Sequence, residues 1–132
     1  DLWKFDGSDW KQLRDIANND SDEDYDDDYA ITRAGTVSFV IDGRGYIATG
    51  TRSGVTSDYW VYDPEEDLWY GDSDDDYTPM TNVHNVSSGG SSRSYAVSFS
   101  TGKRGFVLSG SSGTSYFDDV YELLPYEQED VD

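Results

Sequence analysis

The sequence predicts an all-β protein that contains a repeated unit of four antiparallel strands. Aromatic residues make up 15% of the chain, and bulky aromatic and β-branched residues favour strands over helices. No segment has apolar residues that recur convincingly with the period of a helix. The segment 33–50, RAGTVSFVIDGRGYIATG, aligns without a gap with the segment 93–110, RSYAVSFSTGKRGFVLSG. This alignment indicates an internal duplication.

Each strand of the unit has its own local signal. Residues 36–41 and 46–49 are rich in β-branched and aromatic side chains, and the Asp42-Gly43 pair between them is typical of a tight hairpin. The rest of the unit is predicted as a Gly/Ser/Thr-rich loop at 50–57, a third strand at 59–62, a turn at 63–66 and a short fourth strand at 68–70.

The third strand recurs at both ends of the chain. The segment 58–62, DYWVY, matches 1–5, DLWKF, directly, and it matches 118–123, DDVYEL, once a one-residue insertion is allowed. This last copy has Tyr and Leu in place of the two aromatic residues of the motif. The sequence therefore predicts two strands at the N-terminus, then four, then three.

The repeated pattern resembles the Kelch-type repeats of β-propellers. The stretch YIATG followed by DYWVYDPEEDLW carries the resemblance, and the longer form is most similar to Kelch-like proteins of Bacteroidetes. The resemblance covers residues 1–13, 33–70 and 93–124, and it implies four-stranded blades around a central channel. In this chain, Thr49-Gly50 and Ser109-Gly110 replace the usual Gly-Gly doublet that ends the second strand.

The resemblance implies that the chain supplies about two and a half blades of a larger six- to eight-bladed propeller. Propellers close with about four to eight blades, so this chain cannot close alone. We expect a C-terminal part of a longer polypeptide, and a ring of identical chains is the alternative. The expected organisation is the third and outer strands of a partial blade at 1–14, an acidic insert at 15–32, a complete blade at 33–70, an acidic then Ser/Gly-rich insert at 71–92, a final blade lacking its outer strand at 93–124, and an acidic tail at 125–132.

Aromatic side chains are expected to form the core between neighbouring blades. A blade must bury both faces, and large rings supply most of the buried area. The third strand is expected to present Trp60 and Tyr62 on one face, and the fourth strand to bring Trp69 to the same region. A platform on which sugar rings stack is the alternative role for these side chains. The expected core residues are Trp3, Phe5, Trp10, Phe39, Trp60, Tyr62, Trp69, Phe99 and Tyr121.

The net charge excludes several classes of partner. With 28 acidic and 9 scattered basic residues, the chain carries a formal charge of -19 and would repel nucleic acid and anionic membranes. No apolar run approaches the ~20 residues that span a bilayer, and no signal segment is present in this chain. The absence of cysteine excludes disulfides and thiolate metal sites. The family resemblance implies a periplasmic or extracellular, cell-surface location.

Two acidic inserts are candidates for a calcium site. They follow equivalent outer strands, and clustered carboxylates can bind calcium through oxygen ligands. Solvated loops that aid solubility are the alternative, and no other cofactor is expected. The candidate ligands are Asp20, Asp22, Asp24, Asp72, Asp74 and Asp76.

Two arginines are candidates for ligand binding. Arg33 and Arg93 each precede the first strand of a unit, where an arginine can bind a carboxylate with two hydrogen bonds. Pairing with the acidic insert before each arginine is the alternative. His84, the single histidine, is expected in an exposed loop, and no catalytic motif is present.

These observations favour a non-catalytic binding module that recognises protein or glycan through loops on one face. The alternative is a sugar-processing propeller enzyme, similar to sialic-acid isomerases, with its site at the channel mouth and with Arg33 and Arg93 among its residues. A purely structural part of an assembly is a third possibility. One fold hosts many functions, so the resemblance alone cannot decide among them.

Overall fold

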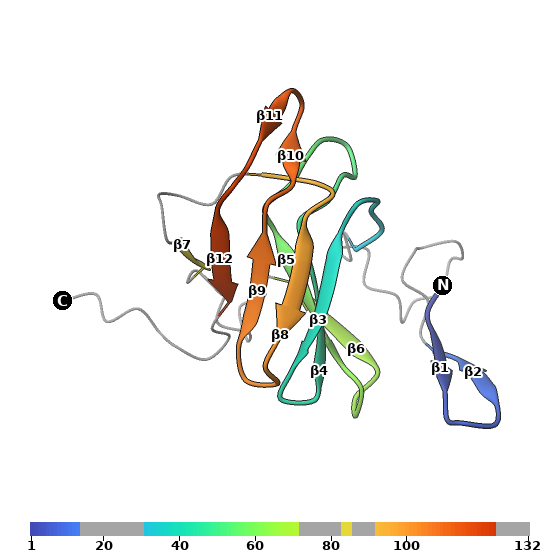
Figure 1. The fold of residues 1–132 in the computed structure, drawn as a ribbon. Coiled ribbons are helices and arrows are strands. Elements are labelled where there is room, and N and C mark those ends of the chain that lie inside the picture. Colours follow the sequence, from blue (N-terminus) through green and yellow to red (C-terminus); the bar gives the residue numbers. More distant parts are fainter. Residues whose placement is uncertain (14–30, 72–82, 86–91, 124–132) are drawn as a thin grey trace.

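The computed structural model describes residues 1–13, 31–71, 83–85 and 92–123. The described residues contain strands and no helix, which confirms the predicted all-β class. Accordingly, none of them belongs to a helix with the length and apolar character needed to cross a bilayer. The strands are β1 (Trp3–Phe5), β2 (Trp10–Gln12), β3 (Val37–Ile41), β4 (Arg44–Ala48), β5 (Tyr59–Asp63), β6 (Leu68–Gly71), β7 (Val83–Asn85), β8 (Val97–Ser100), β9 (Gly105–Leu108), β10 (Ser111–Ser112), β11 (Ser115–Tyr116) and β12 (Val120–Leu123) (Figure 1).

The first unit forms one antiparallel sheet in the order β3-β4-β5-β6. The hairpin between β3 and β4 turns at Asp42 and Gly43, whose φ angles of 50° and 79° fit a two-residue type I′ turn. Because two residues complete this turn, β4 begins at Arg44 rather than at Tyr46, where the sequence predicted it. The four strands of this unit are otherwise those expected.

The second unit also forms a four-stranded sheet, in the order β7-β12-β9-β8. Its fourth strand corrects the expectation that the final unit lacks an outer strand. Strand β7 lies in the segment 71–92, which was predicted as an insert, and it pairs antiparallel with β12. This strand also contains His84, which was expected in a loop. It satisfies an edge of β12 that would otherwise have no backbone partner.

The two sheets pack face to face around the main core. Phe39 of β3 lies against Gly105 of β9: a Cβ placed on Gly105 would be 2.4 Å from one ring carbon of Phe39. The first strands of the two units, β3 and β8, which we call the inner strands, run side by side in Figure 1. The core residues are Val37, Phe39, Ile41, Tyr46, Ala48, Tyr59 and Val61 from the first sheet, and Val107, Tyr121 and Leu123 from the second.

The opposite face of the first sheet carries a second cluster. The strand register places Trp60 and Tyr62 on this face and pairs Tyr62 with Trp69, whose ring centroid lies 5.1 Å from that of Tyr62. This confirms the predicted grouping of the three rings. Leu2, which precedes β1, and Ile31, which lies in the loop before β3, also pack on this face.

Four of the expected core aromatics are instead exposed. Phe39, Trp60, Trp69 and Tyr121 are buried and Tyr62 is half-buried, as expected for core residues. The exposed four lie on two faces that no further sheet of the described chain covers. They are Trp3, Phe5 and Trp10 of the β1-β2 hairpin, and Phe99 of β8.

The second strand of each unit ends in a left-handed turn. Thr49 and Gly50 have φ angles of 61° and 102°, and Ser109 and Gly110 have φ angles of 56° and 93°. Thr and Ser thus adopt the conformation that the usual first glycine of this doublet would favour. Gly50 has no substitute, because a Cβ there would be 2.8 Å from the carbonyl oxygen of Ala34.

Candidate binding pocket

The polar centre of the candidate site is an ion pair between Arg33 and Asp58. Arg33 lies four residues before the start of β3, and Asp58 immediately precedes β5. These two strands run in the same direction on either side of β4, so their starts lie at one end of the sheet, about 10 Å apart at ordinary strand spacing. A long arginine side chain spans that distance.

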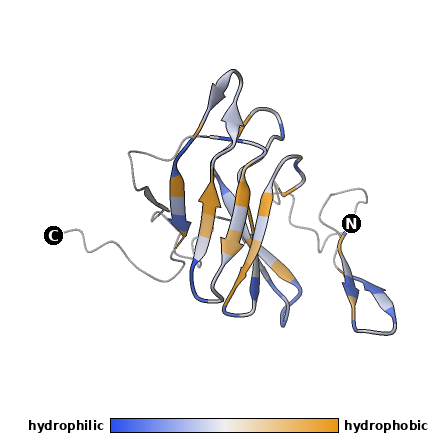
Figure 2. Ribbon diagram, viewed as in Figure 1, coloured by the Kyte–Doolittle hydropathy of each residue, from blue (hydrophilic) through white to orange (hydrophobic). Residues whose placement is uncertain are grey.

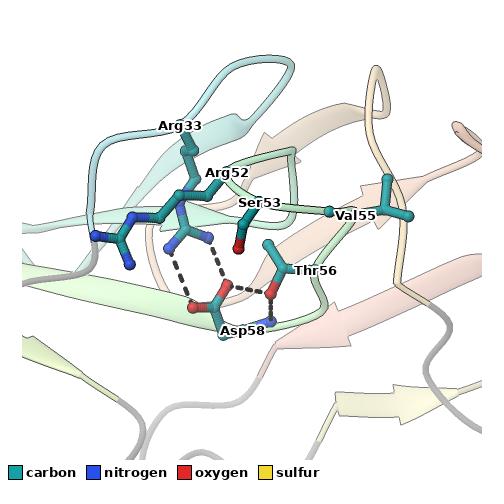
Figure 3. Close-up of a pocket in the computed structure, with 7 residues that line it drawn as sticks. Arg33, Arg52, Ser53, Val55, Thr56 and Asp58 are labelled. Carbon is teal, nitrogen blue, oxygen red and sulfur yellow. Dashed lines mark hydrogen bonds and ion pairs between the residues drawn. The ribbon is translucent and has the colours of Figure 1, made fainter.

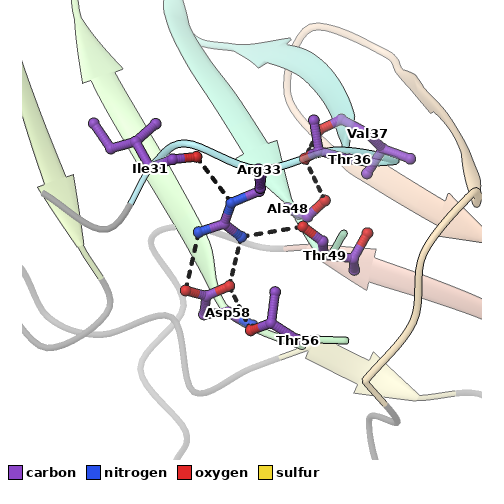
Figure 4. Close-up of polar contacts among 8 residues, drawn as sticks. All are labelled: Ile31, Arg33, Thr36, Val37, Ala48, Thr49, Thr56 and Asp58. Carbon is purple, nitrogen blue, oxygen red and sulfur yellow. Dashed lines mark hydrogen bonds and ion pairs between the residues drawn. The ribbon is translucent and has the colours of Figure 1, made fainter. Parts of the chain in front are cut away.

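The guanidinium of Arg33 is fully engaged by groups of its own unit (Figure 4). Nη1 lies 2.5 Å from Oδ1 of Asp58, and Nη2 lies 3.1 Å from Oδ2. Nη1 also donates to the carbonyl of Thr49, and Nε donates to the carbonyl of Ile31. Only 2% of the Arg33 side chain is exposed. The pair therefore joins the ends of three neighbouring strands.

The second unit repeats this arrangement. Nη1 of Arg93 lies 2.5 Å from Oδ1 of Asp119 and donates to the carbonyl of Ser109 at 2.7 Å. The guanidinium also lies 4.4 Å from the ring centroids of Phe117 and Tyr121. Both arginines therefore have a structural role. Their partners are Asp58 and Asp119, which lie outside the two acidic inserts at 15–32 and 71–92.

Both aspartates are stabilised in their charged form. The hydrogen bond from Arg93 lowers the pKa of Asp119 by more than burial raises it. Burial alone would raise the pKa of Asp58, but hydrogen bonds from Arg33 and Thr56 outweigh it, so this pKa is also below its usual value. A lowered pKa in the folded state stabilises the fold at pH values above the pKa of the unfolded chain, about 3.9 for Asp.

A pH series should reveal this contribution. Stability provided by Asp119 is present at pH 7 and is lost as the pH falls through the lowered pKa, so the window lies below about pH 4. We expect Asp119→Asn to be less stable than the parent at pH 7, and the difference to shrink between about pH 4 and pH 2. Urea unfolding of both proteins measures it, and taking the difference cancels the other carboxylates. A constant difference over this range would contradict the assignment.

A pocket opens beside the Arg33–Asp58 pair. It is a hollow of about 330 Å³ formed by the loop between β4 and β5. In Figure 3, two dashed lines mark the polar contacts between Arg33 and Asp58, whereas no dashed line joins Arg52 to another pocket residue. Arg52 is exposed, and its side chain forms no hydrogen bond or ion pair with another residue of the described ranges. The lining residues are Arg33, Arg52, Ser53, Gly54, Val55, Thr56 and Asp58.

The pocket carries one unit of unbalanced positive charge among its lining residues. Arg33 and Asp58 neutralise each other, and among the described residues no carboxylate pairs with the guanidinium of Arg52. The hydroxyl of Ser53 adds a polar group, and Val55 adds an apolar side chain. This combination can hold an anionic group such as a carboxylate, which an arginine binds with two parallel hydrogen bonds.

The second unit replaces this loop with a hairpin. Strands β10 and β11 pair Ser111 with Tyr116 and Ser112 with Ser115. The hairpin and the pocket loop project from the same end of the two sheets, at the top of Figure 1. In the second unit Ser112 stands where the first has Arg52, counting from the aligned Gly50 and Gly110. The pocket is therefore a feature of the first unit.

The sequence identified Arg33 but not the rest of this site. Asp58 and Asp119 stand at the head of the recurring third-strand motif, so the repeat itself held a signal for them. Arg52 lies in a loop that differs between the two units, so the repeat gave no signal for it. The six candidate calcium ligands, Asp20, Asp22, Asp24, Asp72, Asp74 and Asp76, all lie outside the described residues. Within the described residues, no group of three or more potential metal ligands gathers.

Neither family models nor curated proteins offer a match to this chain. The resemblance to Kelch-type repeats therefore rests on the repeated motif alone, and the geometry of the pocket is the basis for a functional proposal.

Proposed function

We propose that the chain is part of a Kelch-like β-propeller that acts as a non-catalytic binding module of an exported bacterial protein. Its ligand, a protein or a glycan, is recognised through the loops at one end of the sheets. Two observations support the propeller: each unit forms a four-stranded antiparallel sheet, and the two sheets pack face to face along their inner strands. The pocket beside Arg52 is the observation that carries the binding role.

The ligand group is a carboxylate, from an acidic sugar or from an acidic protein side chain. Within the described part of the chain, Arg52 is the charged residue of the pocket that no neighbour neutralises, and a carboxylate matches its planar pair of donors. The volume of about 330 Å³ is at the small end for ligand pockets and suits one sugar ring or one side chain. A longer ligand would extend from this pocket over the neighbouring loops.

Removal of Arg52 should abolish most of the binding. We expect glucuronate or a sialic acid to bind the parent chain, and their uncharged methyl esters to bind more weakly. Arg52→Gln should weaken binding of the acids by about tenfold or more, because a hydrogen bond to a charged group is worth about 1.5–3 kcal/mol. Titration followed by NMR or calorimetry measures both effects.

A matched control removes the same charge elsewhere. Lys11 is exposed on the β1-β2 hairpin and does not line the pocket, so Lys11→Gln should leave the affinity unchanged. Equal binding of the acids by Arg52→Gln and by the parent would contradict the proposal, as would equal binding of acids and esters.

The enzymatic alternative uses the same fold in another way. A sugar-processing propeller of the sialic-acid isomerase type would use channel-facing arginines on its substrate. Arg33 and Arg93 are each buried and each hold an aspartate of their own unit, which favours the binding module. Incubation of the chain with a sialic acid, followed by analysis for an isomerised product, would distinguish the two functions.

A further inference from the structure

One face of the second sheet is exposed although it repeats the buried face of the first. We call it the open face, and it consists of Val97, Phe99, Phe106 and Leu108 on β8 and β9. In the first unit, Val37 is 5% and Phe39 is 8% exposed. In the second unit, the equivalent Val97 is 60% and Phe99 is 50% exposed. Figure 2 shows the hydrophobic colouring that runs along both strands.

The buried face of the first sheet shows how such a face is covered. The ring of Phe39 packs directly on the backbone of Gly105, where a Cβ would lie 2.4 Å and 2.7 Å from two ring carbons. Apolar side chains of the covering sheet surround this contact, namely Val107, Tyr121 and Leu123. A ring on one sheet thus fits a gap that a glycine leaves in the next.

Backbone contacts fix the same two sheets at both ends. At the hairpin end, the amide of Asp42 donates to the carbonyl of Gly102 at 2.9 Å. At the loop end, the amide of Tyr95 donates to the carbonyl of Gly35 at 2.9 Å. Between them, the hydroxyl of Ser98 donates to the carbonyl of Ser38. The contact is therefore a specific interface along the whole length of the inner strands.

We propose that the open face binds a further sheet of the same repeat, and that a glycine in the second strand of that sheet lies over the ring of Phe99. This inference rests on the proposed propeller, which would supply the next sheet. It does not depend on the identity of the ligand. Its basis is the continuity of one interface: Phe99 stands where Phe39 stands, on the same face of an equivalent sheet.

The first unit indicates that the glycine belongs to the repeat. Gly45 occupies the position of Gly105, and the nearest atom to a Cβ there is the Cβ of Tyr62 in its own sheet, at 3.7 Å. Among the described residues, the space directly over Gly45 is therefore open to an incoming ring. Elsewhere on this face of the sheet, Leu2 and Ile31 pack with Trp60 and Trp69, and they would obstruct the open face of a second copy.

Cysteine labelling can measure whether the open face becomes covered. The chain has no cysteine, so a single introduced thiol reports on its own surroundings. In the unextended chain, we expect Val97→Cys to react rapidly with a thiol reagent and Val37→Cys, its buried equivalent, to react at least about tenfold more slowly. The test protein is the full chain extended at its C-terminus by a second copy of residues 71–123.

In the extended chain, the thiol of Val97→Cys should be protected to about the same extent as that of Val37→Cys. Gly105→Val in the appended copy should restore fast labelling, because its side chain would meet the ring of Phe99. A second variant, Phe99→Ala, removes an exposed ring and should weaken the protection without unfolding either sheet.

Three results would overturn the proposal. The first is labelling of Val97→Cys that is equally fast with and without the extension. The second is protection that neither the glycine change nor Phe99→Ala reduces. The third is protection of the unextended chain that grows with protein concentration, which would assign the open face to a second copy. None of these readouts involves a ligand, so they are independent of the carboxylate titrations.

Discussion

Gly105→Ala is expected to lower the free energy of unfolding by about 1–3 kcal/mol, the usual range for an overpacked core. The new methyl group would lie 2.4 Å and 2.7 Å from ring carbons of Phe39, and 3.1 Å from Cδ1 of Ile41. Both side chains belong to the buried core, so the sheets must separate or the ring must leave its rotamer. Urea unfolding followed by tryptophan fluorescence measures the loss.

Gly45→Ala is the matched control, because it makes the same change at the equivalent position of the first unit. Its methyl group would meet only the Cβ of Tyr62, at an ordinary contact distance of 3.7 Å. Alanine costs less backbone entropy than glycine in a strand, so this variant should be unchanged or more stable by about 0.5–1 kcal/mol. Equal losses in the two variants would show that the close approach of Phe39 is not the cause.

A double substitution separates the contact from any general effect. Phe39→Leu reduces the side chain that meets the new methyl group, so part of the stability lost by Gly105→Ala should return in the double variant. Additive losses would mean that the two positions do not interact.

The sequence predicted those features of the fold that depend on local chemistry. The Asp42-Gly43 turn and the alternation of strand residues follow from turn preferences and from the two-residue period of a strand. The grouping of Trp60, Tyr62 and Trp69 was predicted because two strands joined by a short turn bring such residues to one face. The duplication then extended these predictions to the second unit.

Features that depend on distant parts of the chain were missed. Strand β7 has three residues in a Ser/Gly-rich segment, and it exists as a strand because β12 offers it a free edge. The pairing of Arg33 with Asp58 depends on the order of strands in the sheet, which no local pattern encodes. Which faces would be buried could not be predicted from their apolar residues either, since Phe39 and Phe99 are the same residue type at equivalent positions.

Arg93→Met should destabilise the protein more than any surface change, by about 3–5 kcal/mol, because it removes one partner of a buried ion pair. The Arg93 side chain is 1% exposed, and its loss would leave the carboxylate of Asp119 without its main donor. It would also remove the hydrogen bond to the carbonyl of Ser109, a residue held in a left-handed conformation. Arg93→Lys keeps the charge but not the paired donors, so an intermediate loss is expected.

Arg104→Met is the control for this effect, since Arg104 also pairs through two nitrogens with a carboxylate, that of Glu122, within the same sheet. It also lies over an aromatic ring, with its guanidinium carbon 5.2 Å from the centroid of Phe106. The two arginines differ mainly in burial, because the Arg104 side chain is 54% exposed. Its removal should therefore cost no more than about 1 kcal/mol, as for other surface pairs.

The cause of the larger loss can be tested by removing both charges at Arg93 and Asp119. If the loss comes from an unpaired carboxylate, Arg93→Met combined with Asp119→Leu should be more stable than Arg93→Met alone, because no buried charge remains. Phe117 and Tyr121, which now lie 4.4 Å from the guanidinium, would then contact apolar side chains. A double variant no more stable than the single one would assign the loss to the hydrogen bond with Ser109 and to ring packing instead.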